Sequence, residues 1–487
     1  MPSVNFVRPE LIKMRRNYAL IADTLEGEPQ VKSKGSLYLP PPQPVTTQEG
    51  KDRYNAYRTR AVFYNVTKRT QQGLLGQLFN RAPQIEVPNY LEHTVANMDG
   101  LGVNATQQCK GTSGEVIAFG RAGLLADFPT IEEGKEVSAA DLQSGRVAPT
   151  ITFYPATRII NWRYARDGSA KKLLFVILEE EREIYKPGDY AFTKGKQWRV
   201  CRLDGSGLYT QELYYDASAD PHSRSFPKNA AGDRLDYIPF NFIGSEDNDP
   251  DIDDAPMYSI ASLNIAHYRN SADFEDSTFY VGQPTTVITG LTQAWLDQNL
   301  QGGIRMGSRI AIPLPAGADI KIEQADPNTL AATGMDQKER QMVALGAKLV
   351  EQRQVQRTAT EASQEEAAET SVLSTCADNT SVAYAQAFAD AGLFVSMDEA
   401  GVTFKINTAF EISTMDAATR QETIKEWQMG AISFTEMRQV LRRAGIATLS
   451  DDDAKAAIAE DDALRIAQAQ ALNPPGVQEP GNNGNDA

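Results

Sequence analysis

The chain has 487 residues, of which 41% are hydrophobic, and it carries a formal net charge of −16. This length allows two to four domains with buried cores, while the longest apolar run, Leu173–Leu178, is far shorter than the roughly 20 residues that cross a bilayer. The acidic balance argues against a protein that coats nucleic acid with its whole surface, because phosphate binding needs clustered Lys and Arg. The first residues lack a secretory signal, so we expect a protein that folds and stays in a cytosol.

The first 130 residues have mainly the periodicity of helices. A Pro-rich turn at residues 38–44 separates the first two predicted helices, residues 111–114 read as a turn or helix interruption, and residues 121–128 read as a strand. The helices are expected over residues 1–28, about 50–79, 87–99 and 105–119.

Runs of β-branched and aromatic residues, broken by turn residues, replace the helical pattern between residues 150 and 215. They predict an antiparallel sheet of at least four strands, to which residues 238–244 add another. Residues 245–254 follow as an acidic turn with six acids and no base. We therefore expect an α+β fold in a chain that is mainly helical.

Two long amphipathic helices flank a compact insertion in the next part of the chain. The first helix is expected to have Asp254 as its N-cap and Pro256 in its first turn. The second covers residues 327–351 and contains an internal capping box at residues 336–339. The insertion has strand signals and a small helix around Trp295, so it is predicted to lie at the tip of a two-helix stalk.

The polar stretch RQVQRTATEASQEEAAETS joins the second long helix to a helix rich in Ala, Ser and Thr. Its small residues would let neighbouring helices approach closely. A strand, two short helices and an acidic helix follow, and the last fifteen residues are too poor in apolar residues to order themselves. These segments are residues 363–393, 402–410, 417–427, 433–444, 450–471 and 473–487.

The chain lacks the residue patterns of common catalytic and ligand sites. His93, His222 and His267 have no partner at metal-ligand spacing, and neither G-x-S-x-G nor a P-loop motif occurs. The three cysteines lie far apart, which favours buried thiols over a disulfide or a zinc site. Residues 100–105 fit a dinucleotide fingerprint but follow a helical segment, and the acidic turn lacks the Gly and Glu of a calcium loop. We therefore predict no catalytic residue, no metal and no cofactor.

Basic residues gather on the helix predicted over residues 50–79 and just after it. They are Lys51, Arg53, Arg58, Arg60, Lys68, Arg69 and Arg81. This face could hold phosphate, but interleaved Tyr and Phe residues favour a solvated face or one that pairs with an acidic neighbouring subunit. Arg353 and Arg357 differ, because they lie in a predicted loop without apolar anchors, where unusual charge is a stronger indication of function.

With the stalk, the tip insertion, the polar loop and the small-residue helix in this order, residues 8–445 resemble the portal proteins of tailed bacteriophages. Portal proteins form the ring at the capsid vertex through which DNA enters and leaves the head. The resemblance includes a group of portal-like proteins that often have no functional name. It rests on the phrases VKSKGSLYLPPP, YRTRAVFYNVTKRTQQGLLGQLFNRAP, VIAFGRAGLLADFP, IPFNFIG, LNIAHYRNSADFE, GQPTTVITG and RTATEAS.

The resemblance implies a phage portal fold with a wing, a two-helix stem, an αβ clip, a tunnel loop with a long helix, and a short helical crown. The short crown is where the sequence departs from portals that have a long helical barrel. The implied boundaries are 1–253 for the wing, 254–280 and 327–352 for the stem helices, 281–326 for the clip, 353–363 for the tunnel loop, 364–410 for the long helix and a returning wing strand, 411–472 for the crown and 473–487 for a disordered tail.

The resemblance also implies a function and partners. The subunits would form a homo-oligomeric ring, usually of about twelve copies, for packaging and ejection of double-stranded DNA in the virion, after assembly in the host cytoplasm. Trp295, Leu296 and Arg305 in the clip would dock the terminase large subunit and later the head-to-tail adaptor. The major capsid protein and a scaffolding protein are further expected partners. The tunnel loop would touch DNA phosphates without reading bases, through Arg353, Gln354, Gln356, Arg357, Thr358 and Thr360.

Two other functions stay open at this point. Another virion ring protein, such as an adaptor or a tail component, would also form rings, although adaptors are usually much shorter. A hydrolase acting on nucleic acid or saccharide could use carboxylates of the acidic turn as acid and base. The hydrolase hypothesis predicts a monomer or small oligomer with a pocket that holds perturbed carboxylates.

Overall fold

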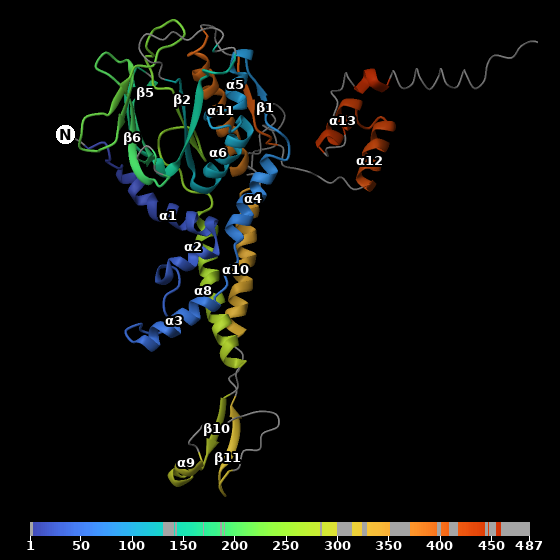
Figure 1. Cartoon of the computed structure of the whole chain (residues 1–487). Helices are drawn as coiled ribbons and strands as arrows, with labels where there is room; N and C mark the ends of the chain where they lie inside the picture. Colours follow the sequence, from blue (N-terminus) through green and yellow to red (C-terminus); the bar gives the residue numbers. More distant parts are fainter. Residues whose placement is uncertain are drawn as a thin grey trace, which may run out of the picture. The chain divides into compact units, whose positions relative to one another are not determined.

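A computed structural model describes the chain as two compact units, Met1–Thr408 and Ala409–Ala487 (Figure 1). The fold mixes helices and antiparallel sheets, as predicted for an α+β protein. Within the part that the structure describes, no helix is long and apolar enough to cross a membrane. The described residues are 3–129, 141, 144–168, 170–185, 188, 190–282, 285–299, 314–323, 329–350, 371–396, 401–408, 417–443, 447 and 454–458.

The strands predicted between residues 150 and 244 form two antiparallel sheets. A 3-10 turn, η3 (Ala156–Arg158), in which Ala156 is buried, follows Pro155 and separates the strands of the first sheet from those of the second. The first sheet has the order β3 (Thr150–Pro155), β2 (Arg121–Asp127) and β9 (Phe240–Gly244). The second has the order β4 (Ile159–Asp167), β5 (Ala170–Ile184), β6 (Thr193–Leu203), β7 (Tyr209–Tyr214) and β8 (Ser223–Ser225). A third pair joins β1 (Gln84–Glu86) to β12 (Thr403–Lys405).

Two buried helices, α6 (Ala105–Phe119) and α11 (Val372–Gly392), pack on the three-stranded sheet. Asn104 and Gln107 form a capping box that fixes the start of α6. The helix interruption predicted at residues 111–114 is wrong, because these residues continue α6. A Cβ atom at Gly114 would lie 3.4 Å from the Leu75 side chain, so the small residue allows close packing against the neighbouring helix α4.

The N-terminal helices differ in part from the prediction. The single helix expected over residues 50–79 is wrong, because the chain breaks at residues 61–65. There Phe63 is buried, and Asn65 accepts a hydrogen bond from the backbone N–H of Lys68 at 3.0 Å, which starts a new helix. The helix predicted over residues 87–99 is short, comprising η2 (Asn89–Leu91) and α5 (Glu92–Ala96). The other helices are α1 (Pro9–Glu26), α2 (Glu28–Ser33), η1 (Gly35–Leu37), α3 (Gln48–Arg60) and α4 (Val66–Leu78).

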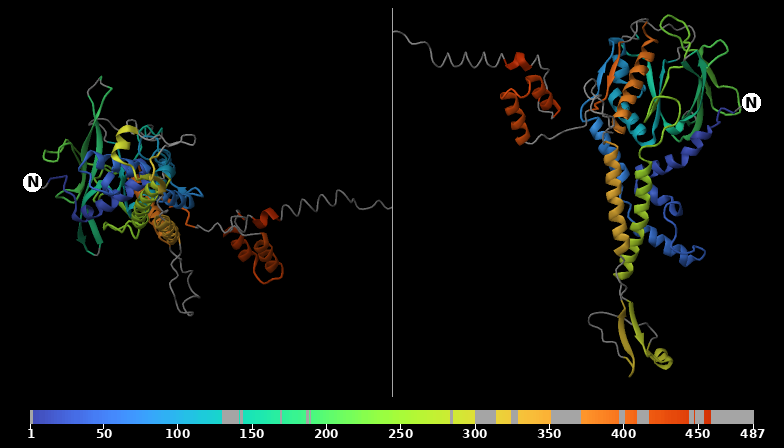
Figure 2. Two further views of the ribbon diagram at one scale, coloured as in Figure 1. Left: turned by 90° about the horizontal axis from the view of Figure 1, so that it is seen from below. Right: turned by 180° about the vertical axis from the view of Figure 1, so that it is seen from behind.

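The long helices α8 (Tyr258–Val281) and α10 (Thr329–Lys348) run side by side in both views of Figure 2, and we call them the helix pair. The predicted N-cap at Asp254 is wrong. Helix α8 starts at Tyr258 without a side-chain cap, and the Asp254 carbonyl instead accepts a hydrogen bond from the Ser245 hydroxyl at 3.2 Å. The predicted capping box at residues 336–339 lies in the interior of α10, so it does not mark the start of a helix.

A small hairpin is inserted between the two helices of the pair. Strand β10 (Thr285–Thr289) pairs with β11 (Asp319–Glu323) in antiparallel register, and α9 (Gln293–Asn299) follows β10. Because β10 starts soon after α8 ends, and β11 precedes α10 closely, the hairpin lies at the end of the helix pair that is remote from the sheets (Figure 1). This placement agrees with the insertion predicted at the tip of a stalk.

The C-terminal unit contains the two short helices predicted there, α12 (Ala417–Gln428) and α13 (Phe434–Arg443). Trp427 and Phe434 pack edge to face with ring centroids 5.9 Å apart, and Met437 is buried. Of the acidic helix predicted over residues 450–471, the described residues 454–458 are helical. The C-terminal tail lies outside the described residues.

Candidate functional site

Polar groups and a buried Met connect the two helices of the pair. His267 on α8 is buried and lies 3.2 Å from the Glu339 carboxylate on α10, measured from Nε2 to Oε1. Met342 is the buried side chain among those described on α10. Most of α10 is therefore open to solvent in the single chain, including Leu330 and Val343, which are 82% and 70% exposed.

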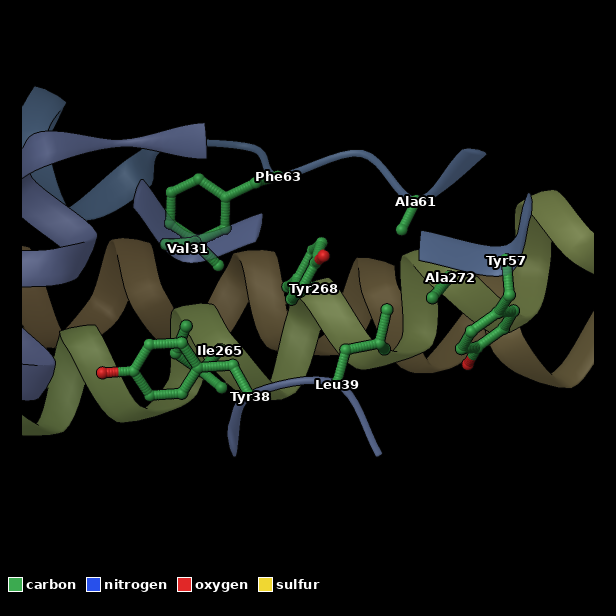
Figure 3. Packing of buried hydrophobic residues seen from close by; sticks show 9 residues of the cluster. All are labelled: Val31, Tyr38, Leu39, Tyr57, Ala61, Phe63, Ile265, Tyr268 and Ala272. Atoms are coloured by element: carbon green, nitrogen blue, oxygen red, sulfur yellow. The ribbon is translucent and has the colours of Figure 1, made fainter. Parts of the chain in front are cut away.

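Residues 28–65, which we call the arm, pack along α8 on an apolar cluster (Figure 3). Phe63 of the arm packs edge to face on Tyr268 of α8 with ring centroids 5.9 Å apart, and Tyr268 is fully buried. Tyr57 and Phe63 therefore pack as the sequence predicted and Tyr54 packs partly buried against them, whereas Tyr64 is exposed. The cluster consists of Val31, Tyr38, Leu39, Tyr57, Ala61, Phe63, Ile265, Tyr268 and Ala272.

An ion-pair cluster, which we call the clasp, fixes the arm to the C-terminal part of α8. Arg53 and Arg60 of α3 both bind the Asp276 carboxylate, the Arg60 contact being 2.5 Å. Each guanidinium also lies over an aromatic ring of α8, with Arg60 4.2 Å from the centroid of Phe279 and Arg53 5.0 Å from that of Tyr280. Burial disfavours the charged carboxylate, but the hydrogen bonds from the two arginines outweigh it and lower the pKa of Asp276.

The clasp was missed in the sequence, although a signal for it exists. Arg53 and Arg60 are seven residues apart and therefore lie on one face of a helix. Nothing local indicates that Asp276, more than two hundred residues later, is their partner. Arg53 and Arg60, two of the seven basic residues noted in the sequence, thus form ion pairs within the chain. The sequence had predicted a face that is solvated or that pairs with a neighbouring subunit.

Three residues were predicted to dock partners, and the side chain of one of them, in the hairpin, is described. Trp295 lies in α9 and is half-buried, and its backbone N–H donates to the Thr292 carbonyl at 3.0 Å. Leu296 also lies in α9, but its side chain is outside the described part of the structure, as is Arg305 altogether. The structure therefore places Trp295 and the Leu296 backbone together on the hairpin.

The predicted tunnel-loop residues, 353–363, lie outside the described residues. The two ends of the surrounding segment are described and meet. The backbone N–H of Leu373, at the start of α11, donates to the carbonyl of Leu349, at the end of α10, at 3.1 Å. The described residues on either side of residues 351–370 therefore lie next to each other. Arg353, Gln354, Gln356, Arg357, Thr358 and Thr360 all belong to this segment.

The acidic turn binds a cation of the protein itself. The side chain of Arg121, which is 2% exposed, donates from Nη1 to the carbonyls of Pro250 and Asp251 at 2.7 and 3.0 Å. Burial lowers the pKa of Arg121 to about 10. Among the residues that the structure describes, no group of three or more His, Cys, Asp or Glu side chains is arranged to hold a metal ion. The turn thus contributes its carbonyl oxygens to the interior.

The remaining residues considered for chemistry have structural surroundings. His222 stacks on Tyr215 with ring centroids 4.0 Å apart. Residues 100–104 belong to the turn between α5 and α6, in which Gly100 and Gly102 have positive φ angles. The cysteines are buried free thiols, as predicted, at Cys109, Cys201 and Cys376.

Comparisons with known proteins bear mainly on the helix pair. Residues 256–393 match the model of a domain of unknown function, DUF4055, which spans α8, the hairpin, α10 and α11. No curated protein matches the chain. The chain thus shares this region with a family whose description names no function.

Similar solved structures come from gene transfer agent (GTA) particles. The neck of an empty GTA particle with C6 symmetry is 14% identical, with 81% of this chain and 93% of that chain covered and a TM-score of 0.37. The neck of a native GTA particle with C12 symmetry is 13% identical, with 82% and 95% covered and a TM-score of 0.37. The virion of a native GTA particle is 14% identical, with 80% and 92% covered and a TM-score of 0.36. Likeness at this level does not define a function.

Proposed function

We propose that the protein is a portal subunit, which forms a homo-oligomeric ring at a capsid vertex for the passage of double-stranded DNA. The observation that carries the proposal is the helix pair with an inserted hairpin at one end and, at the other, a contact between Leu349 and Leu373, which flank the predicted tunnel loop. The sequence resemblance assigns these three parts to the stem, the clip and the tunnel loop, in the same order. The role is structural and requires no catalytic residue or cofactor.

The exposed face of α10 supports assembly into a ring. A helix that buries one side chain and exposes Leu330 and Val343 is unusual in a monomer, because long helices in proteins are stabilised mainly by packing of an apolar face. The opposite side of α8 is already covered by the arm. The exposed face of α10 is therefore the surface available to a neighbouring subunit along the helix pair.

The predicted tunnel loop would line the channel, and its arginines would contact DNA phosphates without reading the bases. A chain with a net charge of −16 repels phosphate over much of its surface, so a few arginines would centre the duplex and still let it slide. Replacing Arg353 and Arg357 with Glu should lower DNA packaging or retention while electron micrographs still show intact rings. Unchanged packaging would remove these arginines from the channel.

The hairpin would dock the packaging motor and later the head-to-tail adaptor, because it lies at the free end of the helix pair. The deciding experiment is negative-stain electron microscopy of the purified full chain, together with its native mass. We expect a ring with a central hole. A monomer or small oligomer would contradict the proposal. A ring that assembles but is absent from the packaging vertex of particles would instead favour an adaptor or tail component.

A further inference from the structure

A groove of about 870 Å³ lies between the N-terminal segment and one face of the five-stranded sheet. Residues 3–10 pass over this face as a strap. At one end the Ser3 hydroxyl donates to the Ala217 carbonyl at 3.2 Å. At the other end the backbone N–H and Nη1 of Arg8 donate to the carbonyls of Ile160 and Trp162, both at 3.0 Å. The strap is thus held at both ends and leaves a space beneath it.

The floor of the groove is apolar and comes from three adjacent strands. Asn161, Ile177 and Val200 are cross-strand neighbours in β4, β5 and β6, and Ile177 and Val200 are buried. The next row is Arg163, Phe175 and Arg202, in which the Arg163 guanidinium lies 5.9 Å from the Phe175 ring centroid. An extended segment that lies on this floor would therefore find aliphatic and aromatic contacts between cationic groups.

The rim of the groove is positive although the chain is acidic. Two of its cations are neutralised, because Arg8 pairs with Glu10 at 2.9 Å and Arg202 with Glu212 at 2.8 Å. The exposed side chains of Arg163 and Lys171 line the groove and have no ion pair with any carboxylate of the described residues. Two cations at the edge of an apolar floor are thus left for a ligand.

We propose that this groove binds an extended acidic segment of another protein chain, whose apolar side chains seat on the floor and whose carboxylates pair with Arg163 and Lys171. The volume lies within the range of about 300–1,000 Å³ that ligand sites commonly have. Charge complementarity selects the partner, and the apolar floor supplies the contact area. The proposal holds whether or not the subunits form a ring.

Nucleic acid fits the groove less well than an acidic peptide does. Binding a phosphate backbone depends on a row of free cations, and here only Arg163 and Lys171 are unpaired among the lining cations. The carboxylates of Glu10 and Asp251 also line the groove and would repel successive phosphates. A peptide can place its few carboxylates beside the two free cations and its neutral residues elsewhere.

The test is selection of a randomised dodecamer peptide library against the purified full chain, followed by fluorescence polarisation with the best peptide. We expect enrichment of peptides that combine Asp or Glu with aliphatic or aromatic residues. The double variant R163E/K171E should bind the selected peptide at least tenfold more weakly. The matched control K68E/K110E changes the net charge equally at exposed sites on α4 and α6 and should bind like the wild type.

Circular dichroism of both variants checks that exposed charge reversals leave the fold intact. The proposal is overturned if no peptide is enriched, if the enriched peptides show no acidic bias, or if R163E/K171E binds them as the wild type does. Displacement of the peptide by an equal concentration of a single-stranded oligonucleotide would reassign the groove to nucleic acid. Ring formation, measured on the same samples, reports separately on the portal proposal.

Discussion

The clasp should determine how firmly the arm is held on the helix pair, and Asp276→Asn tests this directly. Removing one partner of a fully buried ion pair costs about 3–5 kcal/mol, whereas exposed pairs contribute less than about 1 kcal/mol. The Asp276 side chain is 14% exposed, and those of Arg53 and Arg60 are 22% and 24% exposed. We therefore expect an intermediate loss of about 2 kcal/mol in the free energy that opens the arm.

A loss of about 2 kcal/mol corresponds to a roughly 30-fold larger equilibrium constant for opening of the arm, and therefore to roughly 30-fold faster amide exchange when closing is faster than the chemical exchange step. Amide hydrogen exchange with mass spectrometry should show this acceleration in peptides of α3 and little change in those of α6. Asp52→Asn is the matched control, because Asp52 is exposed on α3 and accepts a hydrogen bond from Gln48 of the same helix. If α3 exchanges in Asp276→Asn within threefold of the control, the clasp does not hold the arm.

The same clasp gives a pH dependence with a defined sign. The folded-state pKa of Asp276 is lowered from 3.8. The contribution of the Asp276 carboxylate to the stability of the clasp is therefore fully present above about pH 4, and it is lost as the pH falls through the lowered pKa. After correction for intrinsic exchange rates, the protection of α3 in the wild type should therefore be constant from pH 5 to pH 8. Loss of protection within that range would contradict the assignment.

Three further predictions concern the sheet core, the arm cluster and the hairpin. Burial raises the pKa of Glu115 to about 7 while its carboxylate accepts from the Ala156 N–H at 3.0 Å, so the charged form costs stability as the pH rises from 4.5 to 7. Glu115→Gln should therefore be more stable than the wild type by about 3 kcal/mol at pH 8 and nearly equal to it at pH 4.5, measured by denaturant titration. Phe63→Ala should lower the free energy of unfolding by about 3–5 kcal/mol because it empties a site against Tyr268, and an effect below about 1 kcal/mol would contradict the packing. Trp295→Ala should weaken recruitment of the packaging motor roughly 30-fold in a pull-down while rings still form. The control Gln298→Ala, at an exposed residue of the same helix, should recruit the motor normally. Normal recruitment by Trp295→Ala would exclude Trp295 from the docking surface.

Local patterns were sufficient for most individual elements. The stripe that includes Ile260, Ile265 and Tyr268 predicted α8, since apolar residues at helical spacing need one buried face and these three are indeed buried. The strand runs broken by turn residues predicted β5, β6, β7 and β9 for the same kind of reason, with a period of two, whereas a single run covered both β3 and β4. The insertion at the stalk tip followed from chain order alone, because a short segment between two long neighbouring helices must lie at their shared end.

Other features depended on partners far away in the chain. The break at residues 61–65 was missed although Asn65 is a good helix cap, because the decisive term is burial of Phe63 on Tyr268 of α8. The division into two sheets was missed because alternation shows which residues face a core, and not which strand lies alongside.

The sequence by itself thus determined the type and order of the elements, since these depend on residues within one or two turns of each other. Tertiary structure alone decided that Asp276 holds Arg53 and Arg60, that Arg121 is enclosed by the acidic turn, and that a strap covers a positive groove. Each of these joins groups that are distant in the chain. Salt screens their attraction beyond about 10 Å, so it acts only after the fold has brought them together.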